Sequence, residues 1–263
     1  MKRLQLGLVV EGNSTGSALL RLPAMAEELG PIKAATLRVA RRLSNFLRAG
    51  YAVSDYEELQ AAKLILLRVP DSAVPRIVDE LCASELAFSG LSFVLCESWL
   101  FSDVLDPLRA RGASVATLVA VPSKRRNWFV VEGQPTAMRQ VRRLIERNDA
   151  RTLELHPNTK QLCFAAQLLS TTLPQFLFIT AQNALRAAGI TGNHLHTVLN
   201  EMATEMLRAF LKGARVNWSG PLTDCSAETA KAHFDALRQS NPQIAELVEQ
   251  QLSWVRPKIP SEA

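Results

Sequence analysis

Short apolar runs alternate with helical patterns over the first 150 residues, and this alternation constrains the fold most strongly. The apolar runs cover residues 4–10, 33–39, 63–69, 91–96, 114–121 and 129–132. Helical patterns cover residues 17–29, 74–82, 103–111 and 135–147. Uninterrupted apolar strands are typical of a sheet covered on both faces, and strands that alternate with helices predict parallel βαβ units. We therefore expect an α/β domain over residues 1–150.

The pattern changes after residue 150 and becomes helical. Breaks fall near residues 189–192, residues 213–221 and Asn241-Pro242. We therefore expect an all-α domain over residues 151–263. Residues 161–185 carry no charge and are long enough to span a bilayer. They also contain polar residues such as Gln167, Thr172 and Gln182, so we favour a helix buried inside a soluble assembly.

Composition narrows the class of protein. Hydrophobic residues make up 48% and charged residues 21% of the chain, which excludes bulk disorder. The net charge of +5 lies mostly in the first half and suits a pocket for an anionic ligand. Arginines on residues 139–147 form a basic helix face without aromatic interleaving, so we expect a solvated face and no nucleic-acid partner.

Cysteine and histidine usage points away from metals and disulfides. The four cysteines (Cys82, Cys96, Cys163, Cys225) form no C-x-x-C pair, and no signal segment is evident at the N-terminus. His194 and His196 have no Asp or Glu at ligand spacing. We expect a cytoplasmic protein with no metal site and no membrane partner.

The first apolar run ends in a glycine-containing turn that opens a helical pattern. This arrangement can bind a pyrophosphate, because glycine lets the backbone approach and the free N–H groups of the helix start favour an anion. The usual G-x-G-x-x-G is not intact, and a second glycine follows with one extra residue in the loop. The candidate pyrophosphate residues are Gly12, Asn13, Ser14, Thr15 and Gly16. The alternative is a tight turn with no ligand.

The next turn carries arginines where NAD-preferring sites place a carboxylate. Arg41 and Arg42 follow the predicted second strand, and no carboxylate occurs until Asp55. Guanidinium groups fit a 2′-phosphate, so these residues favour NADP over NAD. The alternative is a solvated basic turn.

Read together, these segments resemble a known family over nearly the whole chain. The chain is similar to the Rossmann-like proteins with a DUF2520 C-terminal domain, which are assigned as NADP-dependent oxidoreductases. Those proteins are distantly similar to pyrroline-5-carboxylate reductase and the β-hydroxyacid dehydrogenases. The matching pieces are the Gly12 loop, Val39-Ala40-Arg41-Arg42, residues 67–74, residues 103–109 with Gly112-Ala113, Thr159-Lys160 and residues 218–222.

The resemblance implies a Rossmann-type sheet domain followed by a helical domain that pairs two subunits. It implies that Lys160 donates a proton or orients the substrate, with Ser98 as a hydrogen-bonding partner for substrate or cofactor. Glu97 would be an unusual carboxylate near the nicotinamide. The implied residues around the nicotinamide are Val69, Pro70, Asp71, Cys96, Glu97 and Ser98.

Several positions depart from the family pattern. The family's His-x-Ser-Gly, Ser-Leu-His-Pro and Tyr-His segments become Cys96-Glu97-Ser98-Trp99, Thr117-Leu118-Val119-Ala120 and Cys163-Phe164, and its Asn becomes Thr172. Hydride transfer needs a proton donor near the acceptor and a group that holds the developing charge. Two functions therefore stay open. The first is an NADP-dependent oxidoreductase for a small carbonyl, imine or hydroxyacid. The second is a catalytically degenerate NADP(H)-binding sensor or a dimeric scaffold.

Overall fold

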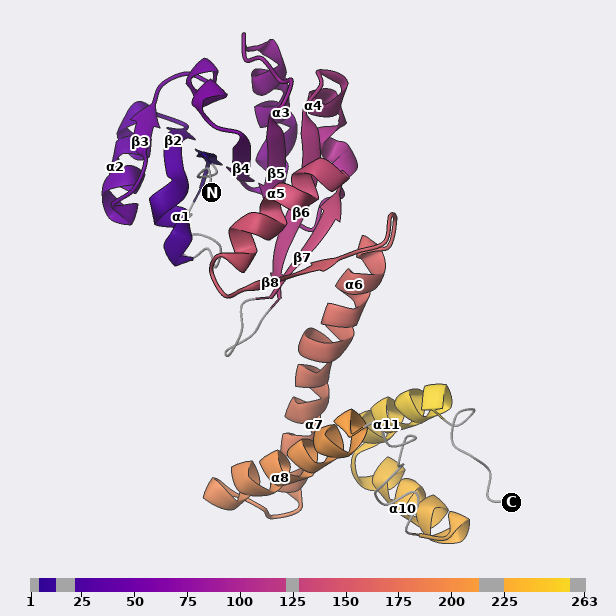
Figure 1. Cartoon of the computed structure of the whole chain (residues 1–263). Helices are drawn as coiled ribbons and strands as arrows, with labels where there is room; N and C mark the ends of the chain where they lie inside the picture. Colours follow the sequence, from indigo (N-terminus) through magenta and orange to yellow (C-terminus); the bar gives the residue numbers. More distant parts are fainter. Residues whose placement is uncertain (1–4, 13–21, 122–127, 213–224, 256–263) are drawn as a thin grey trace. The chain divides into compact units, whose positions relative to one another are not determined.

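The chain forms two compact units in the computed structural model, Met1–Ala165 and Ala166–Ala263 (Figure 1). The structure describes residues 5–12, 22–121, 128–212 and 225–255. Our assignment of residues 1–150 to nucleotide binding and of residues 151–263 to a separate helical domain stays a prediction.

The first unit is built on one eight-stranded sheet, which confirms the predicted α/β class. Its strands are β1 (Leu6–Val10), β2 (Leu29–Ala34), β3 (Tyr51–Val53), β4 (Leu64–Arg68), β5 (Ser92–Cys96), β6 (Ser114–Val121), β7 (Trp128–Gly133) and β8 (Arg151–Glu154). Their order is β3-β2-β1-β4-β5-β6-β7-β8. Strands β1 to β3 are added toward one edge of the sheet, and β4 to β8 are added toward the other. The boundary between β1 and β4 is therefore the topological switch point, where open α/β sheets bind ligands.

One pair of neighbouring strands, β6 and β7, is antiparallel, whereas the sequence pattern predicts a parallel sheet. Residues 122–127 alone join these two strands. A parallel crossover needs about a dozen residues or more, so a connection of this length permits only an antiparallel pairing. All other neighbours in the sheet are parallel.

Helices cover both faces of the sheet, as Figure 1 shows. The helices of this unit are α1 (Pro23–Glu28), α2 (Leu37–Leu47), α3 (Val74–Ala83), α4 (Asp106–Ala110) and α5 (Pro135–Glu146). Leu66 and Val94 face one buried cluster with α1, α2 and α5, whereas Leu67 and Leu95 face a second cluster with α3 and α4. Successive strand residues alternate between the two clusters, which explains why the strands read as continuous apolar runs.

The second strand lies earlier in the chain than the pattern at residues 33–39 predicts. Gly30-Pro31 reads as a helix stop, yet both residues lie within β2. Leu6 pairs with Leu29 and Leu8 pairs with Ile32, so Gly7 faces both Gly30 and Pro31. This irregularity is a β-bulge, and a bulge is one of the few places in a sheet that accommodates a proline.

The predicted basic turn at Arg41 and Arg42 is also corrected. Both residues lie within helix α2, which begins after Thr36. The Thr36 side chain accepts a hydrogen bond from the backbone N–H of Val39 at 3.3 Å. This N-cap starts the helix directly after β2 and places Arg38 in its first turn.

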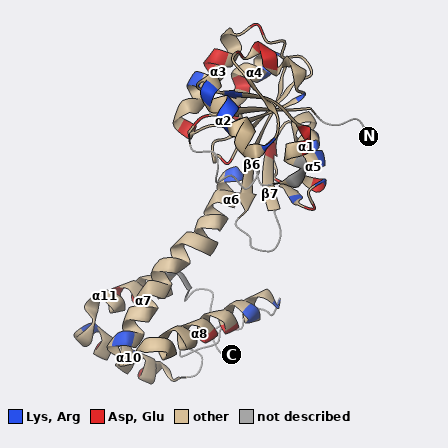
Figure 2. Cartoon of the chain, turned by 90° about the vertical axis from the view of Figure 1, so that its left-hand side faces the viewer, with Lys and Arg blue, Asp and Glu red and all other residues tan. Residues whose placement is uncertain are grey.

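The second unit is helical among the described residues. Helices α6 (Lys160–Gln167) and α7 (Leu173–Ala187) flank a π-helical segment, η5 (Leu168–Thr172), and α6 begins in the first unit. The others are α8 (Gly192–Leu211), α10 (Ala227–Ser240) and α11 (Pro242–Val255). Residues 160–187 are long and apolar enough, by length and composition, to cross a membrane. An 18-residue window within them has a mean hydropathy of 1.5, and none of that window is buried. Figure 2 shows the ribbon without charged residues between the start of α6 and the end of α7.

Gly133 gives a direct test of the β6–β7 pairing. Its φ is +141°, and an added Cβ would lie 2.5 Å from the Ala116 Cα and the Val115 carbonyl oxygen. We expect Gly133→Ala to lower the free energy of unfolding by about 2–4 kcal/mol, measured by urea denaturation. Gly112→Ala is the control, since Gly112 also has a positive φ but meets no atom within 4 Å. Equal losses in the two variants would contradict the placement of Gly133 against β6.

Candidate functional site

Two strand ends meet at the switch point of the sheet. The backbone N–H of Glu11 donates to the Arg68 carbonyl oxygen at 3.1 Å, which ties the end of β1 to the end of β4. Gly12 has a φ of +77°, and an added Cβ there would lie 3.3 Å from Pro70 Cγ. Only glycine adopts this backbone conformation without strain, so the chain can approach a ligand closely at Gly12. The other predicted loop residues, Asn13, Ser14, Thr15 and Gly16, lie outside the described residues.

An ion pair joins the ends of β4 and β5. Arg68 Nε lies 2.6 Å from Glu97 Oε2, and each side chain is 20% exposed. Glu97 has a φ of +59°, and its backbone N–H donates to the Leu118 carbonyl oxygen at 2.7 Å. The predicted unusual carboxylate is therefore present at the strand end, where Arg68 compensates its charge.

Lys160 is the most deeply buried charged residue of this region, with 2% of its surface exposed. Its ammonium group donates to the Ser98 carbonyl oxygen at 3.2 Å and to Thr117 Oγ1 at 2.7 Å. It also donates to the Leu100 carbonyl oxygen. A lysine ammonium has three donors, so these three acceptors satisfy it. To give a proton to a bound substrate, Lys160 must exchange one of these acceptors for the substrate atom. The contact with the Ser98 carbonyl oxygen is the longest of the three and is therefore the weakest.

The environment of Lys160 changes its acidity. Burial lowers the pKa of Lys160 from its usual 10.5 to about 8, with Glu132 and Asp71 opposing the change. Desolvation disfavours the charged amine, whereas the nearby carboxylates favour it. A pKa near the working pH is what a general acid or base needs. Lys160 can therefore give and take a proton near neutral pH.

A hydrogen-bonded line continues from Lys160 to a carboxylate. Thr117 Oγ1 donates to Glu132 Oε2 at 3.2 Å. Ser102 holds the same carboxylate through its hydroxyl at 2.6 Å and its backbone N–H at 3.2 Å. The line joins α6, β6, β7 and the 3-10 helix η4 (Ser102–Leu105). Sequence reasoning missed Thr117 and Glu132 as partners of Lys160. The one available signal was a carboxylate ending an apolar strand.

The structure brings Ser98 and Lys160 together, but through the Ser98 backbone. The Ser98 side chain is 2% exposed, and its Oγ accepts the backbone N–H of Leu100 at 3.1 Å. Cys96 lies in the core, where burial raises the pKa of its thiol. Val69 also points into the core. Its neighbours Pro70 and Asp71 are exposed at the strand end. The side chains of Cys96 and Val69 therefore belong to the core beneath the strand ends and not to the surface of the site.

Three exposed arginines lie on α2: Arg38, Arg41 and Arg42. Arg38 stands in the first turn, next to the end of β2, where Rossmann-type folds recognise the ribose. Arg41 and Arg42 lie one turn further along the helix. Arg38 therefore joins the predicted pair as a candidate for the 2′-phosphate.

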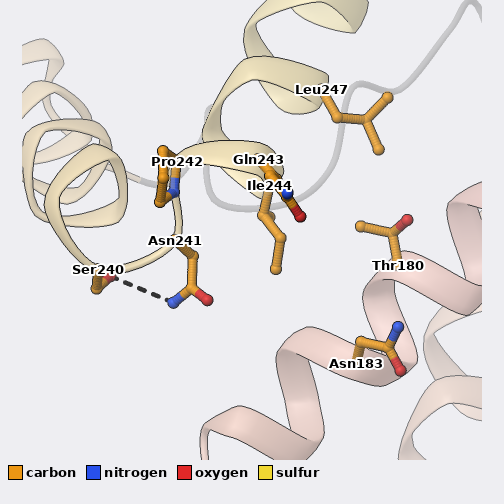
Figure 3. Close-up of a pocket in the computed structure, with 8 residues that line it drawn as sticks. All are labelled: Thr180, Asn183, Ser240, Asn241, Pro242, Gln243, Ile244 and Leu247. Atoms are coloured by element: carbon orange, nitrogen blue, oxygen red, sulfur yellow. Dashed lines mark hydrogen bonds between the residues drawn. The ribbon is translucent and has the colours of Figure 1, made fainter.

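A cavity lies in the helical unit (Figure 3). It has a volume of about 440 Å³ and lies between α7 and the α10–α11 turn. Amide and hydroxyl side chains supply its polar groups: Thr180, Asn183, Ser240, Asn241 and Gln243. None of its lining residues is titratable, so it offers no acid–base chemistry. Within the described part of the chain, no three His, Cys, Asp or Glu side chains gather as a metal site.

Known proteins share this fold at low sequence identity. No curated protein matches the chain in sequence. A protein from Thermotoga maritima is 16% identical with a TM-score of 0.70, over 96% of this chain and 97% of that chain. An imine reductase from Myxococcus stipitatus in complex with NADP+ is 14% identical with a TM-score of 0.68, over 97% and 95%. A pyrroline-5-carboxylate reductase from Coxiella burnetii is 10% identical with a TM-score of 0.58, over 97% and 99%.

The family comparison agrees with the fold. Residues 127–251 match the family described as a domain of unknown function, DUF2520. The fold is shared with an imine reductase solved in complex with NADP+ and with a pyrroline-5-carboxylate reductase, and the sheet has the Rossmann strand order. The resemblance seen in the sequence is thereby confirmed: the chain has a Rossmann-type fold, and its residues 127–251 match the DUF2520 family.

Proposed function

We propose that this protein is an NADP-dependent oxidoreductase that moves a hydride between NADP(H) and a small carbonyl, imine or hydroxyacid. The observation that carries the proposal is the buried Lys160 amine, which lies beside the end of β5 and against Thr117 within β6. The strand ends fit a dinucleotide, because Gly12 leaves the space that a Cβ would fill and exposed arginines on α2 suit a phosphate. When bound, the cofactor would supply or accept the hydride.

The residues of the chain then have separate roles. Gly12 lets the backbone approach the pyrophosphate, and Arg38, Arg41 and Arg42 bind the 2′-phosphate. Pro70 and Asp71 border the nicotinamide at the end of β4. Lys160 gives a proton to the carbonyl oxygen or imine nitrogen of the substrate as the hydride arrives at its carbon.

The cofactor site is tested by titrating the protein with NADPH and NADH while following nicotinamide fluorescence. We expect micromolar binding of NADPH and weaker binding of NADH. Arg41→Ala/Arg42→Ala, and separately Arg38→Ala, should weaken NADPH binding roughly ten- to hundredfold, because each loses charge-assisted hydrogen bonds to the 2′-phosphate. NADH binding should stay unchanged in these variants.

The matched control is Arg139→Ala/Arg143→Ala, which removes two exposed arginines from α5 and leaves α2 intact. This variant should bind NADPH as the wild type does. Equal weakening of NADPH binding in the control would show that the effect of the α2 arginines comes from overall charge and not from contact with the 2′-phosphate. Absence of binding for both nucleotides would mean that the altered glycine loop does not hold a dinucleotide, and the scaffold function would then replace this proposal.

One observation favours a second candidate, a protein that binds NADP(H) without turnover. All three donors of Lys160 and the Ser98 hydroxyl already have partners within the protein. Full occupancy by NADPH, with no oxidation across a broad panel of carbonyls and imines, would support this candidate. Steady turnover of one compound would exclude it.

We also propose a cytoplasmic homodimer that forms through the helical unit. Large apolar side chains on α6, α7 and α8 are exposed in the single chain, including Phe176 and Phe210. Monomeric proteins rarely expose contiguous apolar patches of this kind. A second copy of the chain would cover these faces.

A further inference from the structure

The sheet register places Thr117 and Glu132 directly opposite each other. They are cross-strand partners in the antiparallel β6–β7 pair. Opposite residues in such a pair have Cβ atoms about 4.5–5.5 Å apart, close enough for side-chain hydrogen bonds. The 3.2 Å contact from Thr117 Oγ1 to Glu132 Oε2 follows from this register.

Thr117 differs from the other two acceptors of Lys160 in one respect. The Ser98 and Leu100 carbonyl oxygens can accept a hydrogen bond but have no proton to give. The Thr117 hydroxyl accepts from Lys160 Nζ and donates to Glu132. The donors therefore point one way along the line, from amine to hydroxyl to carboxylate.

The two ends of the line differ in exposure. Lys160 is 2% and Thr117 1% exposed, so water hardly reaches either side chain. Glu132 is partly exposed, and Ser102 orients its carboxylate through two hydrogen bonds. Glu132 is thus the point at which the line meets solvent.

Other titratable groups face Lys160 from the elements around it. Asp71 lies on the 3-10 helix η3 (Asp71–Ala73), Asp103 on η4 and Cys163 on α6 itself, and each favours the charged amine. Hydrogen-bonded contact with Lys160 in the described chain comes instead from Thr117 and the two carbonyls. These groups stabilise the charge, but they do not lie on the hydrogen-bonded line.

We propose that Lys160 exchanges its proton with solvent through Thr117 and Glu132. The inference rests on the proposed function only where Lys160 protonates a substrate. After that step Lys160 is a neutral amine. Water first protonates the Glu132 carboxylate from its exposed side. The Thr117 hydroxyl then gives its proton to Lys160 Nζ and takes a proton from Glu132, which returns to a carboxylate. The reverse sequence serves substrate oxidation.

The inference is tested without any substrate, by NMR on the full chain labelled with [15N]lysine. The exchange rate of the Lys160 ammonium protons with water is measured as a function of pH. The Lys160 signal is assigned by its loss in Lys160→Arg. We expect exchange to slow on the order of tenfold or more in Thr117→Val, which removes the hydroxyl and keeps the shape. Thr117→Ser should restore the wild-type rate, because it keeps the hydroxyl.

Glu132→Gln keeps the shape and removes the charge and the exchangeable carboxyl proton. We expect it to slow the same exchange by a similar factor and to lower the pKa of Lys160 further, since an opposite charge is lost. The matched control is Glu80→Gln, because Glu80 also accepts from a hydroxyl, that of Tyr56 at 2.8 Å, in another part of the unit. Its Lys160 exchange rate should equal that of the wild type.

Each outcome decides the matter. Wild-type exchange in Thr117→Val or in Glu132→Gln would overturn the proposal. A Thr117→Val protein that does not fold leaves Glu132→Gln and Thr117→Ser to decide it. Absence of turnover in the wild type would contradict the proposed oxidoreductase and not the exchange path. Where turnover is found, the limb of the kcat pH profile that reports Lys160 should shift in Glu132→Gln and stay in place in Glu80→Gln.

Discussion

Replacing Lys160 by methionine is expected to lower turnover of a carbonyl or imine substrate by about 10²–10⁴, the usual contribution of a general acid. NADPH affinity should change less than about threefold, because the three hydrogen bonds of the Lys160 amine go to protein atoms and do not involve the cofactor. Methionine keeps the unbranched shape of the side chain and removes its proton. Steady-state rates and the fluorescence titration measure the two effects. Lys63→Met, which changes an exposed lysine, is the control and should leave both unchanged.

The same variant should alter the pH dependence of folding. The folded pKa of Lys160 is about 8, below its usual 10.5. Between these values the unfolded chain binds more protons than the folded chain, so the free energy of unfolding rises with pH across this window. The rise due to Lys160 is about 3 kcal/mol, and it levels off above pH 10.5. Urea denaturation at pH 7.5 and pH 10.5 should show this increment in the wild type relative to Lys160→Met.

Two results would contradict these expectations separately. Normal turnover in Lys160→Met would remove Lys160 from the mechanism while leaving its structural role intact. An identical pH dependence of stability in wild type and variant would show that the amine is not desolvated in the folded chain. The first result would favour the NADP(H)-binding candidate, and the second would also remove the physical basis for proton exchange near neutral pH.

The sequence predicts those parts of the fold in which one strong local signal decides. Strands β1, β4, β5 and β6 are apolar runs bounded by turns, and helix α5 has a clear amphipathic pattern. Strand β2 was misplaced because Gly30-Pro31 is a strong local turn signal. The bulge opposite Gly7 accommodates it, and a bulge depends on the neighbouring strand rather than on the local sequence.

The site shows the same division between local and long-range information. Gly12 follows from a local pattern, whereas the strand-end segments near Pro70 and Glu97, like Lys160, follow from the family resemblance. The partnership of Thr117 with Glu132 arises from the register of β6 and β7. That register depends on strand pairing, which the spacing of apolar residues does not specify. The burial of Lys160 likewise requires that α6 begin beside β6.

The exposed apolar helices lead to the prediction with the largest expected effect. Phe176 on α7 and Phe210 on α8 are 64% and 65% exposed in the single chain. Burying a large apolar side chain contributes about 2 kcal/mol, and a two-fold interface counts each position twice. Phe176→Asp/Phe210→Asp should therefore weaken a homodimer by about 8 kcal/mol. Sedimentation should give twice the 29.0 kDa chain mass for the wild type and 29.0 kDa for the variant.

Gln239→Asp is the control for this experiment, because it introduces an aspartate at an exposed polar position on α10 rather than on an apolar face. This protein should remain dimeric, since a solvated helix position does not contribute to an apolar interface. A wild type of 29.0 kDa at micromolar concentration would contradict the dimer. Recovery of the wild type only with membranes would contradict it in another way, since residues 160–187 would then be covered by lipid rather than by a second copy. The wild type itself separates these cases, because a helix covered by a second copy is recovered as a dimer without lipid, whereas a helix covered by a bilayer is recovered only with membranes.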